Sequence, residues 1–100
     1  MNKLQDGRVY TFKLNSGEEL ITKVVAQSND TVTVENPVSV APGPQGMGLV
    51  PSMFTADPAQ NPTLNMNSVA LYSLTDDAVC MKYLEATTGI RVPEKKIIMG

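Results

Sequence analysis

The stretch that decides the fold runs from Tyr10 to Val40 and reads YTFKLNSGEELITKVVAQSNDTVTVENPVSV. It opens with strict alternation, in which Tyr10, Phe12 and Leu14 share one side and polar residues stand between them. This pattern is typical of a strand with one buried face. The next run, Glu19 to Gln27, is rich in β-branched residues, which favour extended structure. The stretch therefore begins with two predicted strands.

Polar turns separate these runs and fix how the strands follow one another. Asn15–Glu18 is predicted to be a hairpin turn with Gly17 in the left-handed conformation, and Ser28–Asp30 is the next turn. A third strand is predicted from Thr31 to Val40, and Asn36-Pro37 marks a bulge or sharp bend in it, because proline cannot donate a ladder hydrogen bond. Three strands joined by tight turns predict an antiparallel meander.

The next part of the chain is poorer in regular patterns. Residues 41–48 (APGPQGMG) are predicted to be a loop that no regular element can use, and 49–56 to be a fourth strand that is either an edge strand or irregular. Residues 57–62 form a further predicted loop. Two segments, 63–66 and 68–74, complete the sheet as the closing strand. The prediction is thus a mostly β fold, a five-stranded and strongly bent barrel.

The periodicity changes to that of a helix after Leu74. Thr75 is the predicted N-cap, followed by two aspartates in the first turn, where the helix dipole favours negative charge. Apolar positions recur at helical spacing, and Gly89 is the expected C-cap. The predicted buried stripe consists of Val79, Cys80, Tyr83, Leu84 and Thr87. We therefore expect a single domain over 1–100: a barrel over about 8–74, a helix over about 75–88 and a tail over 90–100.

The composition argues against several classes of function. The chain has 100 residues, of which 42% are hydrophobic and 18% charged, as in a small globular domain. It contains no histidine and one cysteine, Cys80, so His/Cys metal sites, Ser-His-Asp triads and Cys-His pairs are not expected. The carboxylate pairs Glu18/Glu19 and Asp76/Asp77 fit solvated charges better than acid–base catalysis. We predict no enzyme activity, no metal and no cofactor.

The cellular compartment is predicted from targeting features that the sequence lacks. There is no apolar run of about 20 residues, as a membrane helix needs, and residues 1–7 do not resemble a signal peptide. A single cysteine cannot form an internal disulfide bond. We therefore expect a cytoplasmic protein without membrane contact.

Positive charge is confined to the two ends of the sequence. The stretch between Lys23 and Lys82 contains no lysine or arginine, and the formal net charge is −2. This layout disfavours a broad phosphate-binding surface.

Two segments resemble the motifs of the Sm-like family, which includes the bacterial RNA chaperone Hfq. Residues 12–20 (FKLNSGEEL) resemble the opening of the first Sm motif, and residues 63–72 (TLNMNSVALY) resemble the second. The Glu35-Asn36-Pro37 step in the third strand, the long loop before the fourth strand and the final helix are similar to small Sm-like proteins of tailed phages. The resemblance implies an SH3-like barrel that joins copies into a ring through edge strands, and a phage-encoded chain would act in the host cytoplasm.

The resemblance also implies single-stranded RNA binding at the inner rim of that ring. The candidate residues at the matching turns are Asn29, Asp30, Asn65, Asn67 and Ser68. The sequence departs from the family here, because no aromatic or methionine stands in the first turn for base stacking and no Arg-Gly pair stands in the second. The same residues are also ordinary turn formers, so both interpretations stay open.

A second class of function is a protein–protein assembly module of a phage or its host that binds no RNA. Met47, Met53 and Phe54 favour it if they form an adhesive partner surface, whereas they could instead fold back over the barrel mouth as an additional core. The basic tail residues Arg91, Lys95 and Lys96 are interpreted as solubilising, with phosphate contact as the alternative.

Overall fold

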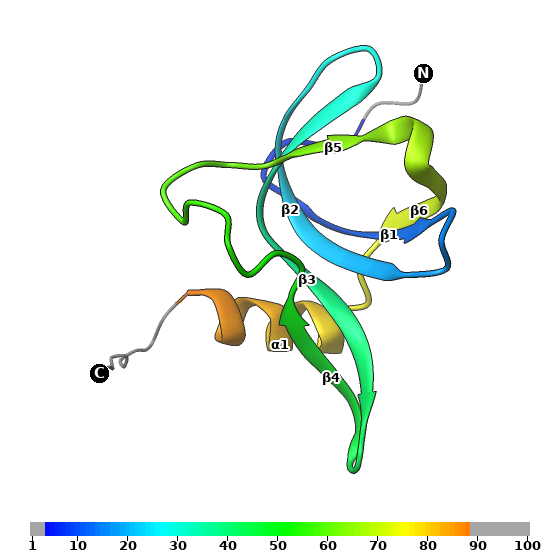
Figure 1. Ribbon diagram of the computed structural model, residues 1–100, viewed down its shortest axis with the longest axis vertical. Helices are drawn as coiled ribbons and strands as arrows, with labels where there is room; N and C mark the ends of the chain where they lie inside the picture. Colours follow the sequence, from blue (N-terminus) through cyan, green and yellow to red (C-terminus); the bar gives the residue numbers. More distant parts are fainter. Residues whose placement is uncertain (1–3, 89–100) are drawn as a thin grey trace.

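Three long strands form the centre of the fold in the computed structural model, which describes residues 4–88 (Figure 1). They are β1 (Val9–Leu14), β2 (Glu19–Gln27) and β3 (Thr31–Gly43), and they pair as an antiparallel meander. The predicted bounds of the second strand are confirmed, and Gly17 in the first turn has a positive φ of 98°. The predicted cap at Gly89 and the tail over 90–100 lie outside the described residues.

The predicted bend at Asn36-Pro37 is confirmed. Asn36 has a positive φ of 54°, and the β2–β3 register shifts between the pairs Ile21↔Val38 and Lys23↔Glu35, so that β3 carries an extra residue. The buried hydroxyl of Thr22 donates to the Glu35 carbonyl at 2.8 Å and satisfies a backbone group beside the bulge. A bulge increases the local twist, so β3 bends here into two halves that face different partners.

The prediction that residues 41–48 form no regular element is wrong, because they form a hairpin. β3 continues to Gly43, turns through Pro44-Gln45, and returns as β4 (Gly46–Pro51), three residues earlier than the predicted fourth strand. The Ser52 N–H donates to the Pro37 carbonyl at 3.1 Å, which fixes the alternation of hydrogen-bonded pairs along the ladder. Pro42 and Pro51 belong to the non-hydrogen-bonded pairs of this ladder, Pro42↔Met47 and Val38↔Pro51. At these positions no N–H donor to the partner strand is required.

The predicted closing strand is two strands separated by a short 3-10 turn, η1 (Met66–Ser68). β5 (Thr63–Asn65) pairs with the first half of β3, and β6 (Val69–Leu74) pairs with β1. The sheet therefore has six strands rather than five, in the order β4-β3-β2-β1-β6, with β5 beside β3. This hydrogen-bonded path is not closed, and its two end strands, β4 and β6, each have one unpaired edge among the described residues.

The core consists of two clusters on opposite faces of the sheet. The first contains Tyr10 and Phe12 of β1 with Tyr72 of β6, whose ring centroids are 6.2–6.4 Å apart. Its other buried members are Leu4, Leu20, Val24, Val32 and Val34. The second cluster contains Val9, Ile21, Val38 and Tyr83, with Cys80 and Val79 partly buried against it. The alternation predicted for the first strand thus places its aromatic side in the core.

Helix α1 (Asp77–Thr87) packs on the second cluster through Tyr83. Its N-cap is Asp76, whose carboxylate accepts from the N–H groups of Ala78 and Val79 at 3.1 and 3.3 Å, and not Thr75 as predicted. Thr75 instead bonds to Thr11 through its hydroxyl, at 2.9 Å, which ties the end of β6 to β1.

Tyr83 is the side chain that joins the helix to the bent part of the sheet. It is 1% exposed, its hydroxyl donates to the Glu35 carbonyl at 2.7 Å, and it accepts from the Lys23 N–H at 3.1 Å. Both partners flank the bulge at Asn36, so one residue holds the helix, β2 and β3 together.

Raising the pH through 10 is expected to destabilise the fold through Tyr83. Burial raises the pKa of the Tyr83 hydroxyl above 10.0, and the hydrogen bond from Lys23 opposes this in part. The unfolded chain therefore loses this proton at a lower pH than the folded chain, so the stabilisation is complete below pH 10 and decreases above it. Urea unfolding at pH 8 to 11 measures this. If a Tyr83→Phe variant lost stability with rising pH as steeply as the unmodified chain, the pH dependence would not come from the Tyr83 hydroxyl.

Candidate functional site

The fold brings the two predicted RNA-binding turns into direct contact. β5 pairs with the start of β3 through Thr31↔Asn65, and the Met66 N–H donates to the Asp30 carbonyl at 2.8 Å. Asn29 and Asp30 therefore lie next to the segment that carries Asn65, Asn67 and Ser68, more than thirty residues away in sequence. The juxtaposition depends on β5, which is three residues long and attached to the part of β3 before the bend.

A third turn joins the same end of the fold. The Asn15 N–H donates to the Ser68 carbonyl at 2.7 Å, and its side-chain amide donates to the Asn67 carbonyl at 3.0 Å. We call the combined surface the polar turn cluster, and its members are Asn15, Asn29, Asp30, Asn65, Asn67 and Ser68. Asn15 was missed by sequence reasoning, although its place beside Gly17 in the first motif could have indicated it.

The side chains of the polar turn cluster are all exposed. Asn65 has a structural role, because its Oδ1 accepts from the Asn67 N–H at 2.9 Å and caps η1. No hydrogen bond within residues 4–88 involves the side chains of Asn29, Asp30, Asn67 or Ser68. These four offer amide, carboxylate and hydroxyl groups, the types that pair with base edges.

The cluster lacks the two features that strengthen RNA binding. Met66, the one apolar residue of η1, is half-buried against the first core cluster, and no aromatic residue belongs to the polar turn cluster. Its charged member is the carboxylate of Asp30. Among the described cations, Lys23 lies 4.0 Å from Glu35 and Arg8 bonds to Gln5, both away from the cluster, and the exposed Lys13 stands two residues before Asn15 without being a member of it. The geometry therefore supports hydrogen bonding to bases rather than attraction to phosphates.

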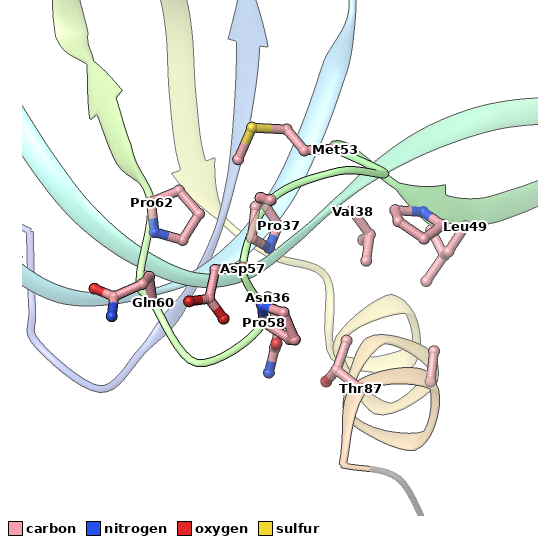
Figure 2. Close-up of a pocket in the computed structure, with 13 residues that line it drawn as sticks. Asn36, Pro37, Val38, Leu49, Met53, Asp57, Pro58, Gln60, Pro62 and Thr87 are labelled. Carbon is pink, nitrogen blue, oxygen red and sulfur yellow. The ribbon is translucent and has the colours of Figure 1, made fainter. Parts of the chain in front are cut away.

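A pocket of about 380 Å³ lies between the bend in β3, the end of α1 and the loop over residues 52–62 (Figure 2). The loop is tied at both ends to β3, by the bond from Ser52 to Pro37 and by the Val34 N–H, which donates to the Pro62 carbonyl at 2.9 Å. The walls of the pocket include Pro37, Pro58, Pro62 and Met53, and Asp57 is the charged residue in the lining. No sequence motif indicated this pocket.

Large apolar side chains remain in solvent on the loop and on the two end strands. Met47, Met53 and Phe54 are 71%, 48% and 83% exposed, so they do not form the additional core that was one of the two alternatives. On the end strands, Val50 of β4 and Leu71 and Leu74 of β6 are 39%, 68% and 45% exposed. A second groove, of about 460 Å³, separates the β3–β4 hairpin from the start of α1.

Comparison with known proteins does not assign the chain to a family. No model of a known protein family matches it, and a search of curated proteins finds no significant similarity. Within residues 4–88, no helix has the length and apolar character needed to cross a bilayer. In the same part of the chain, no three His, Cys, Asp or Glu side chains gather in a way that could hold a metal ion.

Proposed function

We propose that this chain is an Sm-like barrel protein that joins copies of itself into a ring and binds single-stranded RNA weakly at the polar turn cluster. The proposed barrel is supported by the segment β5–η1–β6, which connects β3 to β1. β5 is bonded to β3, β6 is bonded to β1, and η1 connects them directly, so the sheet curves around Tyr10, Phe12 and their neighbours. A sheet bent in this way is expected of a small SH3-like barrel.

The ring is supported by the two open edges. β4 and β6 are the end strands of the sheet, each has a free side, and each exposes large apolar side chains: Met47 and Val50 on one, Leu71 and Leu74 on the other. Unpaired strand edges that are not protected by charge favour pairing with another chain. Because the edges lie at opposite ends of one sheet, pairing β4 of one copy with β6 of the next is a head-to-tail contact, which closes into a ring when the rotation allows.

The RNA proposal depends on one observation, the hydrogen-bonded convergence of the turns around Asn29 and Asn67. It places exposed amides from two distant segments on one surface, suited to the edges of unstacked bases. Since the cluster has no cation, we expect micromolar or weaker affinity and a shallow dependence on salt.

Fluorescence anisotropy with oligo-U and oligo-A at low salt tests the RNA proposal. Replacing Asn29 and Asn67 together with alanine removes two side chains that make no internal hydrogen bond, so the fold should be unaffected. Each lost hydrogen bond is worth about 0.5–1.5 kcal/mol, so we expect the double variant to bind roughly 5- to 150-fold more weakly. Asn61→Ala, an exposed asparagine outside the cluster, is the matched control. Absence of binding by the unmodified chain at tens of micromolar, or equal binding by the double variant, would end the proposal.

The second candidate function is a protein–protein assembly module of a phage or its host that does not bind RNA. The exposure of Met53 and Phe54 on the loop favours it, because such side chains are typical of partner surfaces. Affinity capture from lysate with and without nuclease separates the two functions. A partner that survives nuclease supports the assembly module, and one that disappears supports RNA binding.

A further inference from the structure

The carboxylate of Asp30 is the charged group of the polar turn cluster, and it makes no structural bond in the described part of the chain. There, no hydrogen bond and no ion pair involves this side chain. By contrast, the Asp57 carboxylate serves its own loop, because it accepts from the Ala59 N–H at 3.0 Å. The turn at Asp30 is closed by backbone groups alone, since the Ser28 N–H donates to the Thr31 carbonyl at 2.8 Å. The exposed Asp30 carboxylate is therefore available to a ligand.

The fold brings an asparagine from the other turn to the same surface as Asp30. The Asp30 carbonyl accepts from the Met66 N–H at 2.8 Å, and Asn67 is the next residue along the chain. The backbone of Asn67 is held on both sides, because its N–H donates to Asn65 and its carbonyl accepts from the Asn15 amide. The exposed Asn67 side chain thus has a fixed point of attachment. This surface offers a carboxylate, which only accepts hydrogen bonds, together with an amide, which both donates and accepts.

The four RNA bases differ in the hydrogen-bond donors that they offer to a carboxylate. The Watson–Crick edge of guanine presents two adjacent donors, the N1–H and the N2 amino group, which one carboxylate accepts as a bidentate pair. The neighbouring O6 atom of guanine is an acceptor, to which an asparagine amide can donate. Adenine and cytosine each present one amino group beside an acceptor nitrogen. Uracil presents a single N3–H between two carbonyl oxygens, which repel a carboxylate.

We propose that Asp30 makes the polar turn cluster selective for bases that carry an amino group, with guanine bound most tightly and uracil most weakly. The inference rests on the proposed RNA binding and names the class of base that the same site takes. Asparagine amides pair with donors and acceptors alike, so Asn29 and Asn67 discriminate little between bases. Bonds to the Asp30 carboxylate are charge-assisted and form only with a base that has a suitable donor. Asp30 is thus the specificity-determining residue of the cluster.

Fluorescence anisotropy of the full chain measures this preference with oligoadenylates of equal length, in which every third base is guanine, cytosine or uracil. The guanines are isolated from one another, so that the probes stay single-stranded. We expect the guanine-bearing probe to bind roughly 5- to 10-fold more tightly than the uracil-bearing probe, which is at the lower end for a bidentate contact because the site is exposed. Asp30→Asn keeps a turn-forming side chain and exchanges an acceptor oxygen for a donor, so the preference for guanine should disappear.

Asp57→Asn is the matched control for the change in net charge. It removes the same charge from an exposed carboxylate outside the cluster, and asparagine keeps an oxygen for the Ala59 N–H. An effect of net charge alone acts equally on all probes, so this variant should retain the preference for guanine.

The outcomes separate this inference from the proposed function. If no probe binds at tens of micromolar, the RNA binding is wrong and the inference falls with it. If the probes bind equally, or if the uracil-bearing probe binds best, Asp30 does not select bases although the RNA proposal stands. A preference for guanine that persists in Asp30→Asn would also overturn the inference, because another group would then be its source.

Discussion

A lysine on either open edge of the sheet is expected to reduce the assembly to single chains. Met47 of β4 is 71% exposed and Leu71 of β6 is 68% exposed, so replacing either with lysine leaves the core of the isolated chain intact. In the proposed ring the same positions lie at the contact between copies, where a buried lysine is costly and protects the edge from pairing. Sedimentation velocity should give a mass of 10.8 kDa for Met47→Lys and for Leu71→Lys.

A charge pair distinguishes the proposed contact from general disruption. In a head-to-tail ring, every contact joins the β4 edge of one copy to the β6 edge of the next. A chain that carries both Met47→Lys and Leu71→Glu places opposite charges across each contact, and it should recover assembly relative to Met47→Lys alone. Met81→Lys, which adds the same charge on the exposed side of the helix, is the control and should assemble normally. Single-edge variants that keep the mass of the unmodified chain would contradict the edge contact.

Replacing Tyr83 with alanine is expected to have the largest effect on stability. Tyr83 is 1% exposed and is the buried residue through which α1 packs on the second core cluster. Truncating a buried aromatic residue costs about 3–5 kcal/mol, and the Lys23 N–H loses its acceptor as well. Since the free energy of unfolding of a small domain is about 5–15 kcal/mol in total, the variant should be close to unfolded at 37 °C.

Two further variants separate the contribution of the Tyr83 hydroxyl to stability from that of the aromatic ring. Tyr83→Phe keeps the ring and removes both hydroxyl bonds, so urea unfolding should show a smaller loss of about 1–3 kcal/mol. The Glu35 carbonyl keeps its bond from Thr22 in this variant, which limits the loss. Met81→Ala, on the exposed side of the same helix, should change stability by less than about 0.5 kcal/mol. If Tyr83→Ala were as stable as Met81→Ala, the helix would not be held as described.

The meander could be predicted from sequence because its signals are local. Alternation at Tyr10, Phe12 and Leu14 determines which side of β1 is buried, and Gly17 and Ser28–Asp30 provide the turns on which the register depends. The bend at Asn36-Pro37 was also predictable, since proline in the middle of a strand leaves few alternatives to a bulge. The approximate bounds of the helix follow from its apolar spacing in the same way.

The β3–β4 hairpin could not be predicted because its sequence resembles a loop. Three glycines and two prolines within residues 41–48 disfavour a strand on propensity alone. The pairing is possible because Pro42 falls at a position that needs no donor, and this depends on the register with Ser52 and Pro37. The N-cap was misplaced by one residue for a similar reason, since Thr75 is held by Thr11 across the sheet.

Part of the candidate site could be predicted from the sequence. The resemblance to the two Sm motifs indicated Asn29, Asp30, Asn65, Asn67 and Ser68, and the structure brings them together through the short strand β5. Whether they bind RNA stays a prediction. Asn15 stands beside Gly17 in the first motif, which could have indicated it, whereas the proline-lined pocket is formed by tertiary contacts of residues 52–62 with β3 and α1, for which single-sequence patterns carry no signal.

The mass of the unmodified chain in solution tests the central claim most directly. Multi-angle light scattering at micromolar concentration should give one species whose mass is a whole-number multiple of 10.8 kDa, at least threefold, as a closed ring requires. A mass of 10.8 kDa at the same concentration would contradict self-association through the β4 and β6 edges.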